Sequence, residues 1–519
     1  MFRTMLQDNR HSHAAWQAEY RRQLERRLAL SSDYLSKFPA AQVRAHIRSF
    51  VTLLNEARRF PDLAEKTLLL ISQLHPLPMR WGLGHLWEKE LRFALEHISP
   101  ERADLTAEYR CALGEVYQYR GQFEKAIAEA GGVLSMSGAS PELIARAARI
   151  MFTCCRANGQ LQKADEVIEQ VGERLMGDLP AADIPAHVAQ AWLEYQQCRL
   201  EQMRERGEVD RALELVEDMI WLDRREGMRD LTADLYTHRS TLLWVRSRYP
   251  QAVSDLKQAM QIFEEAGDPF NAESLNSNLG LVYWTMGELD LAEKTLLSAI
   301  RFYRETGSDQ LLTYDTGNLG LIYFARGDLE PALRLTEEHI ALADRINFVY
   351  EYHRGRRNLG TVLYYFGEYE RSIEETTVSH KFYETCGSRD AYALDDLWLA
   401  LCYHALGEPE RALALARKTL EQAGVLKSRV LEQITLRCLA FFLPVEEREP
   451  LLLRSLELAK EMERKVEEAA VWLALAEVYT GADRRCAWQT GEEILRAAGA
   501  AKWLEGRSPG NPPFLPLLL

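Results

Sequence analysis

The feature of this sequence that most constrains its fold is a 40-residue repeat marked by glycine. Steps of one repeat length in both directions from Gly287, in the segment MGELDLAEKTLLSAI, reach glycine at four of the five other positions and serine at the fifth. The first series is Gly207, Ser247, Gly287, Gly327, Gly367 and Gly407. Five residues after each of these comes a small residue, at Ala212, Ala252, Ala292, Ala332, Ser372 and Ala412. Twenty residues after the first five comes a second series, at Gly227, Gly267, Gly307, Asn347 and Gly387.

This pattern predicts that each unit folds as a helical hairpin. Helix A ends in a tight turn at the first glycine, and helix B ends at the second, which closes it as a left-handed C-cap. Asn347 fits this role because Asn is the ordinary residue that most readily replaces glycine in that conformation. The small residue near the start of helix B lets the two helices approach closely. One hairpin cannot bury its apolar face alone, so the sequence predicts an all-α fold, an α-solenoid of stacked antiparallel helix pairs.

The chain divides according to how closely each part keeps the repeat. Residues 187–426 contain six regular 40-residue units, and the segment MGDLPAADIP just before them predicts a longer interrupting loop. Residues 44–186 and 427–505 keep the pattern loosely, as expected of helix pairs and a cap whose outer faces meet water. Residues 1–43 predict an N-terminal helical segment. Residues 506–519 form a Pro-rich tail that cannot continue a helix.

Composition and motifs exclude several classes of function. The formal net charge of −14 argues against a general nucleic-acid binder, which needs a basic surface. The eight cysteines form no C-x-x-C pair and no zinc-type cluster with histidine, and phosphate-loop, H-E-x-x-H and G-x-S-x-G motifs are missing. The N-terminus lacks an apolar signal sequence, and no run of 18 apolar residues occurs. We therefore expect a cytoplasmic protein that is not an enzyme, needs no cofactor or metal, and does not bind membranes.

The repeated segments NLGLVYWTMGELDLAEKTLLSAI, NLGLIYFARGDLEPALRLTEEHI and NLGTVLYYFGEYERSIEETTVSH resemble the tetratricopeptide repeat family. The third departs from the family pattern by Leu363 at the Tyr position and Ser372 at the Ala position. The 40-residue period is similar to the extended repeats of kinesin light chains, Leu-Gly-Asn-type G-protein modulators, bacterial peptide-sensing regulators and maltose-activator-type signalling ATPases. The resemblance implies a right-handed superhelix whose concave face, lined by the A helices, receives a peptide or a partner protein.

Two rows of side chains at the repeat spacing lie on the concave side in the family pattern. An Asn row is formed by Asn278, Asn318 and Asn358, with His238 and Trp398 at its ends. An aromatic row is formed by Trp244, Trp284, Phe324 and Tyr364, with His404 beyond it. An Asn amide can both donate to and accept from a peptide backbone, and aromatic rings offer area to apolar side chains. The alternatives are that the amides bond to the neighbouring unit and that the rings pack against it.

A pair of arginines breaks the repeat. Arg354 and Arg357 lie three residues apart and should share the groove face beside Asn358. Tyr314, at the place of Arg354 one unit earlier, belongs to the same candidate surface. Two guanidiniums can clamp a carboxylate of an acidic partner, so the pair favours a partner with an acidic or carboxylate-bearing segment. The alternative is an intramolecular ion pair with a carboxylate such as Asp315 or Glu351.

These features favour an adaptor or scaffold that binds a peptide or protein partner in its concave groove. The alternative is a ligand-responsive regulatory sensor, in which binding changes the pitch of the superhelix and so controls an effector. The two hypotheses share the groove and differ in whether its shape changes on binding.

Overall fold

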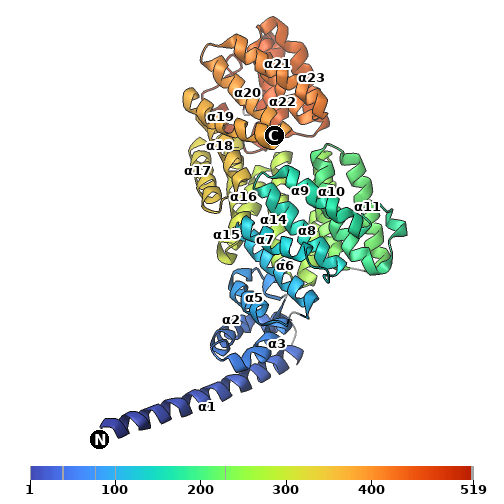
Figure 1. The fold of residues 1–519 in the computed structure, drawn as a ribbon. Coiled ribbons are helices and arrows are strands. Elements are labelled where there is room, and N and C mark those ends of the chain that lie inside the picture. Colours follow the sequence, from blue (N-terminus) through green and yellow to red (C-terminus); the bar gives the residue numbers. More distant parts are fainter. Residues whose placement is uncertain (1, 38–39, 76, 100, 228, 516–519) are drawn as a thin grey trace.

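The computed structural model describes residues 2–37, 40–75, 77–99, 101–227 and 229–515. It is 84% helical, and the described residues form twenty-five α-helices and no β-strand. The predicted all-α fold is therefore confirmed: the helices stack in adjacent pairs as an α-solenoid (Figure 1). No helix within these ranges is long and apolar enough to cross a membrane. Residues 516–519 of the predicted tail, and residues 1, 38 and 39 of the predicted N-terminal segment, lie outside the described residues.

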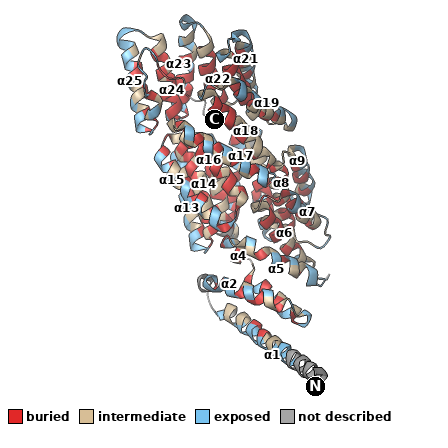
Figure 2. Cartoon of the chain, turned by 90° about the vertical axis from the view of Figure 1, so that its left-hand side faces the viewer, coloured by how far each residue is buried: buried red, intermediate tan, exposed pale blue. Residues whose placement is uncertain are grey.

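The first five helices form the narrow end of the molecule, where α1 projects from the array in both views (Figure 1, Figure 2). Leu24 and Leu28 of α1 are buried, because α1 packs against α2 and α3. These helices are α1 (Phe2–Lys37), α2 (Ala40–Ala57), α3 (Ala64–Leu74), α4 (Leu77–Arg80) and α5 (Gly84–His97), with a 3-10 turn η1 (Pro61–Leu63) before α3.

From α6 onward, inner helices that face the concave side alternate with outer helices. The inner helices are α6 (Ala103–Tyr119), α8 (Pro141–Ala157), α10 (Ala189–Glu205), α12 (Arg229–Val245), α14 (Pro269–Met286), α16 (Asp309–Arg326), α18 (Val349–Tyr365), α20 (Arg389–Ala405), α22 (Arg429–Phe442) and α24 (Lys465–Val478). The outer helices are α7 (Phe123–Leu134), α9 (Leu161–Gly172), α11 (Val209–Glu226), α13 (Tyr249–Glu265), α15 (Leu289–Thr306), α17 (Leu329–Arg345), α19 (Tyr369–Cys386), α21 (Pro409–Leu426), α23 (Val445–Glu461) and α25 (Gly481–Ala497). Of the short 3-10 helices, η3 (Ala181–Asp183) lies in the predicted loop before α10, and η2 (Glu173–Leu175) and η4 (Ala186–Val188) flank that loop. A further one, η5 (Ala501–Leu504), follows α25.

Left-handed residues end the helices where the two series predict them. Gly287, between α14 and α15, has φ +80°, and Asn347, after α17, has φ +54°. Ser247 also adopts this conformation, with φ +57°, so the serine keeps the turn that glycine makes in the other units. The first series therefore caps the C-termini of the inner helices, just as the second series caps those of the outer helices. A left-handed residue allows the following backbone amide to hydrogen-bond to the last carbonyls of the helix.

The six small residues at the start of the outer helices are completely buried. This confirms that the two helices of each pair approach closely at that point, as ridge-and-groove packing around a small side chain requires. Ser372, the one non-alanine member, donates a hydrogen bond from its hydroxyl to the Gly360 carbonyl oxygen at 2.6 Å, which satisfies its polar group inside the pair. Buried positions run along all the stacked pairs (Figure 2).

Successive turns of the superhelix touch one another. Helix α6 lies against α16, and α8 lies against α18. The rings of Phe123 and Phe348 meet at 4.9 Å between centroids, and Tyr249 Oη donates to the Met462 carbonyl oxygen at 2.8 Å. Because these contacts join units far apart in the sequence, the concave side is an interior bounded by two turns of the chain.

Candidate functional site

The inner helices surround a cavity of about 1420 Å³, which we call the larger cavity. Helices α10 to α20 supply most of its lining, with residues at the ends of α8 and α9 and the turns near residues 207–211, 386–391 and 425–430. Eight of the ten residues predicted to bind a partner line it: Trp244, Trp284, Tyr314, Asn318, Phe324, Arg354, Arg357 and Asn358. The other two, Asn278 and Tyr364, are half-buried and are not among its lining residues.

The larger cavity is basic although the protein is acidic. Its lining contains ten Lys or Arg residues and six Asp or Glu residues, which leaves a net formal charge of +4. The whole chain carries −14. A concave wall of one sign concentrates field lines, so this cavity attracts anionic groups even though the chain as a whole repels them.

Arg354 is held inside a buried network. Its Nε donates to Glu351 Oε2 at 2.7 Å, and its Nη1 donates to Asn318 Oδ1 at 3.0 Å. His339 Nε2 lies 3.0 Å from the same Glu351 oxygen. Burial opposes the charge of Glu351, but Arg354 and His339 together lower the pKa of its carboxyl below the usual value. The intramolecular pair considered as an alternative for Arg354 is therefore formed, with Glu351 as the partner.

Arg357 is held more loosely than Arg354. Its Nε is 3.7 Å from Asp395 Oδ1, and its Nη1 donates to the Ala391 carbonyl oxygen at 3.5 Å. The distance to Asp395 is too long for a hydrogen bond, and the distance to Ala391 is at the limit for one. The guanidinium also lies 5.3 Å from the Tyr383 ring. Burial raises the pKa of Asp395 to about 7, so its carboxyl only partly balances the arginine at neutral pH. Arg357 is therefore the better placed of the two arginines to meet an anionic ligand.

The three members of the Asn row differ in their surroundings. Asn318 uses its carbonyl oxygen to accept from Arg354. Asn358 is only 8% exposed and lines the larger cavity, and its side-chain amide makes no hydrogen bond with any residue that the structure describes. The side-chain amide of Asn358 therefore has donor and acceptor capacity that a ligand backbone in the cavity could use.

Most of the aromatic row packs against other parts of the chain. Trp244 donates from Nε1 to Thr285 Oγ1 of the next unit at 2.8 Å, and Tyr364 contacts Trp398 at 6.1 Å between ring centroids. Phe324 is 1% exposed, and its ring meets that of Trp503 at 6.1 Å. These contacts correspond to the packing alternative for this row. Trp284 differs, because it lines the larger cavity and its buried Nε1 has no hydrogen-bond partner within the described residues.

A second cavity of about 920 Å³ adjoins the first and extends the interior toward the N-terminal helices. The two share the lining residues Arg156, Leu161, Arg204, Tyr314, Tyr350 and Glu351. The smaller cavity is lined mainly by α6, α8, α10, α12 and the start of α14. Nearly half of its lining residues lie in the divergent units, where the repeat gave no row of equivalent positions.

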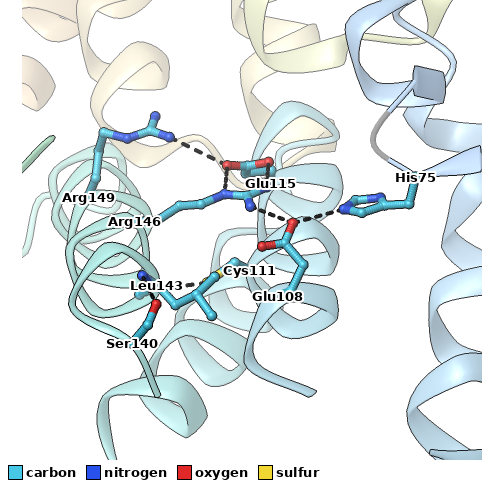
Figure 3. Close-up of polar contacts among 8 residues, drawn as sticks. All are labelled: His75, Glu108, Cys111, Glu115, Ser140, Leu143, Arg146 and Arg149. Carbon is cyan, nitrogen blue, oxygen red and sulfur yellow. Dashed lines mark hydrogen bonds and ion pairs between the residues drawn. The ribbon is translucent and has the colours of Figure 1, made fainter. Parts of the chain in front are cut away.

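One wall of the smaller cavity is a chain of charged groups on α6 and α8 (Figure 3). Arg146 lies between two carboxylates, 2.8 Å from Glu108 Oε1 and 2.7 Å from Glu115 Oε2. His75 lies 2.9 Å from the same Glu108 oxygen. Burial disfavours the charge of Glu108, but His75 and Arg146 outweigh it and lower its pKa to about 2. Arg149 reaches Glu115 at 3.4 Å, so this wall is ordered by its own ion pairs.

Helices α10 and α12 contribute carboxylates to the same cavity that have less support. Glu194 Oε2 is buried without a hydrogen-bond partner within the described residues, and burial raises the pKa of Glu194 and of Asp234. Seven acidic and five basic residues line this cavity, which leaves a net formal charge of −2. The interior therefore changes sign from basic in the larger cavity to acidic in the smaller one.

The repeat model for the tetratricopeptide repeat matches residues 231–305 and 271–345, within the regular units that surround the larger cavity. Residues 231–345 of the chain are therefore tetratricopeptide (TPR) repeats. A similar solved structure is that of a Rap protein complexed with competence and sporulation factor, with 11% identity, 70% of this TPR chain and 98% of the other covered, and a TM-score of 0.51. Another is Cut9 with Hcn1 from the APC/C, with 15% identity, coverage of 81% and 73%, and a TM-score of 0.51. At these identities the likeness shows the TPR fold alone. No curated protein has a matching sequence.

Proposed function

We propose that this TPR array is an interaction scaffold that holds an extended, acidic segment of a partner protein in its interior. The observation that carries the proposal is the basic larger cavity within an acidic chain. In it, Arg357 is only loosely paired and lies next to Asn358, whose side-chain amide has no hydrogen-bond partner among the described residues. A carboxylate of the partner would meet Arg357, and the partner backbone would use the amide of Asn358. The name of the Rap structure records a complex with a competence and sporulation factor, which supports binding of a partner by a protein of this fold.

The change of sign along the interior gives the bound segment a direction. Its acidic part would lie in the larger cavity, and a basic side chain or amino terminus would lie near Glu194 and Asp234 in the smaller one. Complementary potentials of this kind set the register of a ligand and disfavour the reversed orientation. A segment without such a pattern would leave the buried carboxylates unpaired.

Site-directed photo-crosslinking tests where the partner binds. A photoreactive benzoyl-phenylalanine replaces Tyr350, which lines both cavities, or Leu297, which is 42% exposed on outer helix α15. In native lysate, we expect a partner to crosslink from position 350 and not from position 297. Arg357→Ala and Asn358→Ala should reduce the crosslink, whereas Arg417→Ala, at an exposed position of outer helix α21, should not. Crosslinks only from position 297, with both variants still folded, would place the partner on the outer face.

A regulatory sensor is the second candidate, and the contacts between superhelical turns favour it. Trp503 Nε1 donates to the Ala325 carbonyl oxygen at 3.0 Å, and Lys502 pairs with Asp328, so a few groups set the spacing of the turns here. A ligand that bridges the shared residues of α8, α10, α16 and α18 would bias this spacing, because these helices belong to different turns. Small-angle scattering with and without the crosslinked partner separates the two: a scaffold keeps its radius of gyration, and a sensor changes it.

A further inference from the structure

We propose that α22 and α24 carry a second binding surface, for an extended, proline-containing apolar segment of a partner protein, which residues 512–515 of the chain occupy in its absence. The surface, here called the tail surface, is formed by Arg437 and Phe441 of α22 and Glu467 of α24. None of these three residues lines the larger cavity, so binding at the two places can be measured separately.

The tail surface occupies groove positions of the repeat. Arg437 and Phe441 stand two repeat units after Arg357 and Thr361. Both of those earlier residues line the larger cavity, and α22 begins one repeat length after α20, so the register of the repeat is unbroken here. The positions that face the interior in one unit therefore face residues of the chain's own tail two units later.

The tail is held as a peptide ligand is held. Arg437 Nη1 donates to the Leu515 carbonyl oxygen at 2.7 Å, and its guanidinium carbon lies 5.2 Å from the Phe514 ring. The Phe514 ring contacts that of Phe441 at 4.5 Å between centroids, with the two ring planes tilted by 36°. Pro512, Pro513 and Leu515 are buried, with Leu515 only 1% exposed. One backbone carbonyl, one ring and a few apolar side chains thus hold residues 512–515 on this surface.

The stretch that leads to this buried anchor is an exposed tether. Residues 505–508, 510 and 511 are exposed, and Gly506 turns the chain with φ +68°. An outer helix, α25, already packs along α24 and closes the array, so the tail is not the element that caps the last pair. A short tether of this kind presents its anchor at an effective concentration on the order of mM, which a free partner segment must exceed.

The chemistry of the surface defines the segment that fits it. Proline has no N–H, and extended proline-containing segments turn their carbonyls outward without internal hydrogen bonds. Arginine offers only donors, so Arg437 matches such a carbonyl, and Glu467 holds the guanidinium in place at 3.1 Å. Proline-rich segments commonly dock in this extended form against aromatic side chains. The partner segment therefore needs prolines followed by an aromatic and an apolar residue, and no charge.

Fluorescence anisotropy with a labelled peptide of residues 509–515, amidated at its end, tests this surface in the full-length protein. The wild-type chain should bind the peptide weakly, because its own tail competes. Phe514→Ala weakens the tail and should tighten peptide binding at least tenfold. Arg437→Lys keeps a positive charge for Glu467 but loses the donor fork, so added to Phe514→Ala it should reverse most of that gain. Arg507→Gln, at an exposed position of the tether, serves as the matched control and should bind as weakly as the wild type.

Three results would overturn the proposal. The first is a folded Phe514→Ala chain that binds the peptide no more tightly than the wild type. The second is loss of hydrogen-exchange protection in α22 to α25 of that variant without any gain in affinity, which would make the tail a structural part of the array. The third is a wild-type dimer that the peptide dissociates, which would make a second copy the occupant. If Arg437→Lys unfolds the end units, Phe441→Ala in the same background tests the ring contact instead. Arg357→Ala should leave peptide binding unchanged, which separates this surface from the larger cavity.

Discussion

Two glycines at the same place in adjacent units should respond in opposite ways to substitution by alanine. Gly320 and Gly360 are separated by one repeat length, and each ends an Asn-Leu-Gly segment inside an inner helix. In a helix interior, alanine is favoured over glycine by about 0.5–1 kcal/mol, because glycine loses more conformational freedom on folding. If helix propensity alone decided the outcome, both substitutions would stabilise the protein.

The space around the two positions differs. A methyl group on Gly320 would lie 3.4 Å from Leu335 Cβ and 3.5 Å from Thr336 Oγ1, which are ordinary contacts. A methyl group on Gly360 would overlap Thr376 Oγ1 and lie 3.0 Å from the Ser372 carbonyl oxygen. Backbone cannot move aside as a long side chain can, and overpacking of this kind costs about 1–3 kcal/mol.

We therefore expect Gly320→Ala to stabilise the array by up to about 1 kcal/mol and Gly360→Ala to destabilise it by about 1–2 kcal/mol. Urea denaturation followed by far-UV circular dichroism gives the free energy of unfolding. Hydrogen exchange of α18 and α19 shows whether the change is local, as nearest-neighbour stacking requires. A Gly360→Ala protein as stable as Gly320→Ala would refute the claim that close approach of the two helices decides this position.

Three further substitutions test other parts of the structure. Arg357→Ala should weaken binding of an acidic partner by about 2–5 kcal/mol if the partner carboxylate stays buried, by calorimetry, and by less at high salt if that contact is exposed. Burial raises the pKa of Asp315 to about 7, so its charge destabilises the folded state increasingly as pH rises from about 4 to 7. Asp315→Asn should remove this pH dependence and stabilise the protein at pH 8 by a few kcal/mol. Denaturation at several pH values measures both effects. Trp503→Ala should cost about 2 kcal/mol and enlarge the radius of gyration in small-angle scattering, because it removes the contact with Ala325 between turns; an unchanged radius would mean that other contacts set the spacing.

The local pattern of the sequence was sufficient to predict the helix pairs. Each signal involved acts within one unit: a left-handed residue ends a helix, and a small residue admits its neighbour. Asn347 and Ser247 show that the conformation, rather than the glycine, is what the repeat preserves. The repeat signals are weaker toward the ends of the chain. The 40-residue spacing does not continue from the regular units to α6 and α8, so the repeat does not predict the charged wall formed by Arg146 and Glu115.

The environment of the aromatic row could not be predicted in this way. The ring of Phe324 meets Trp503, which lies 179 positions later in the sequence. That contact depends on the pitch of the superhelix, which sums small rotations over several units, and no single unit encodes it. A repeat position therefore indicates which side of the array a side chain faces, but not whether another turn of the chain already covers it.

Arg354 and Arg357 show that two arginines on the same helix face can differ in how strongly they are paired within the chain. Arg354 and Arg357 share a helix face, yet Arg354 is held at 2.7 Å by Glu351 while Arg357 lies 3.7 Å from Asp395. The difference arises because Glu351, three residues before Arg354, is on the same helix, whereas Asp395 belongs to the next unit and is partly neutral near pH 7. When burial keeps the neighbouring carboxyl partly protonated, less of the arginine's positive charge is neutralised, and more of it can interact with a ligand. The binding capacity of this interior thus depends less on how many cations line it than on which of their partners are prevented by burial from ionising.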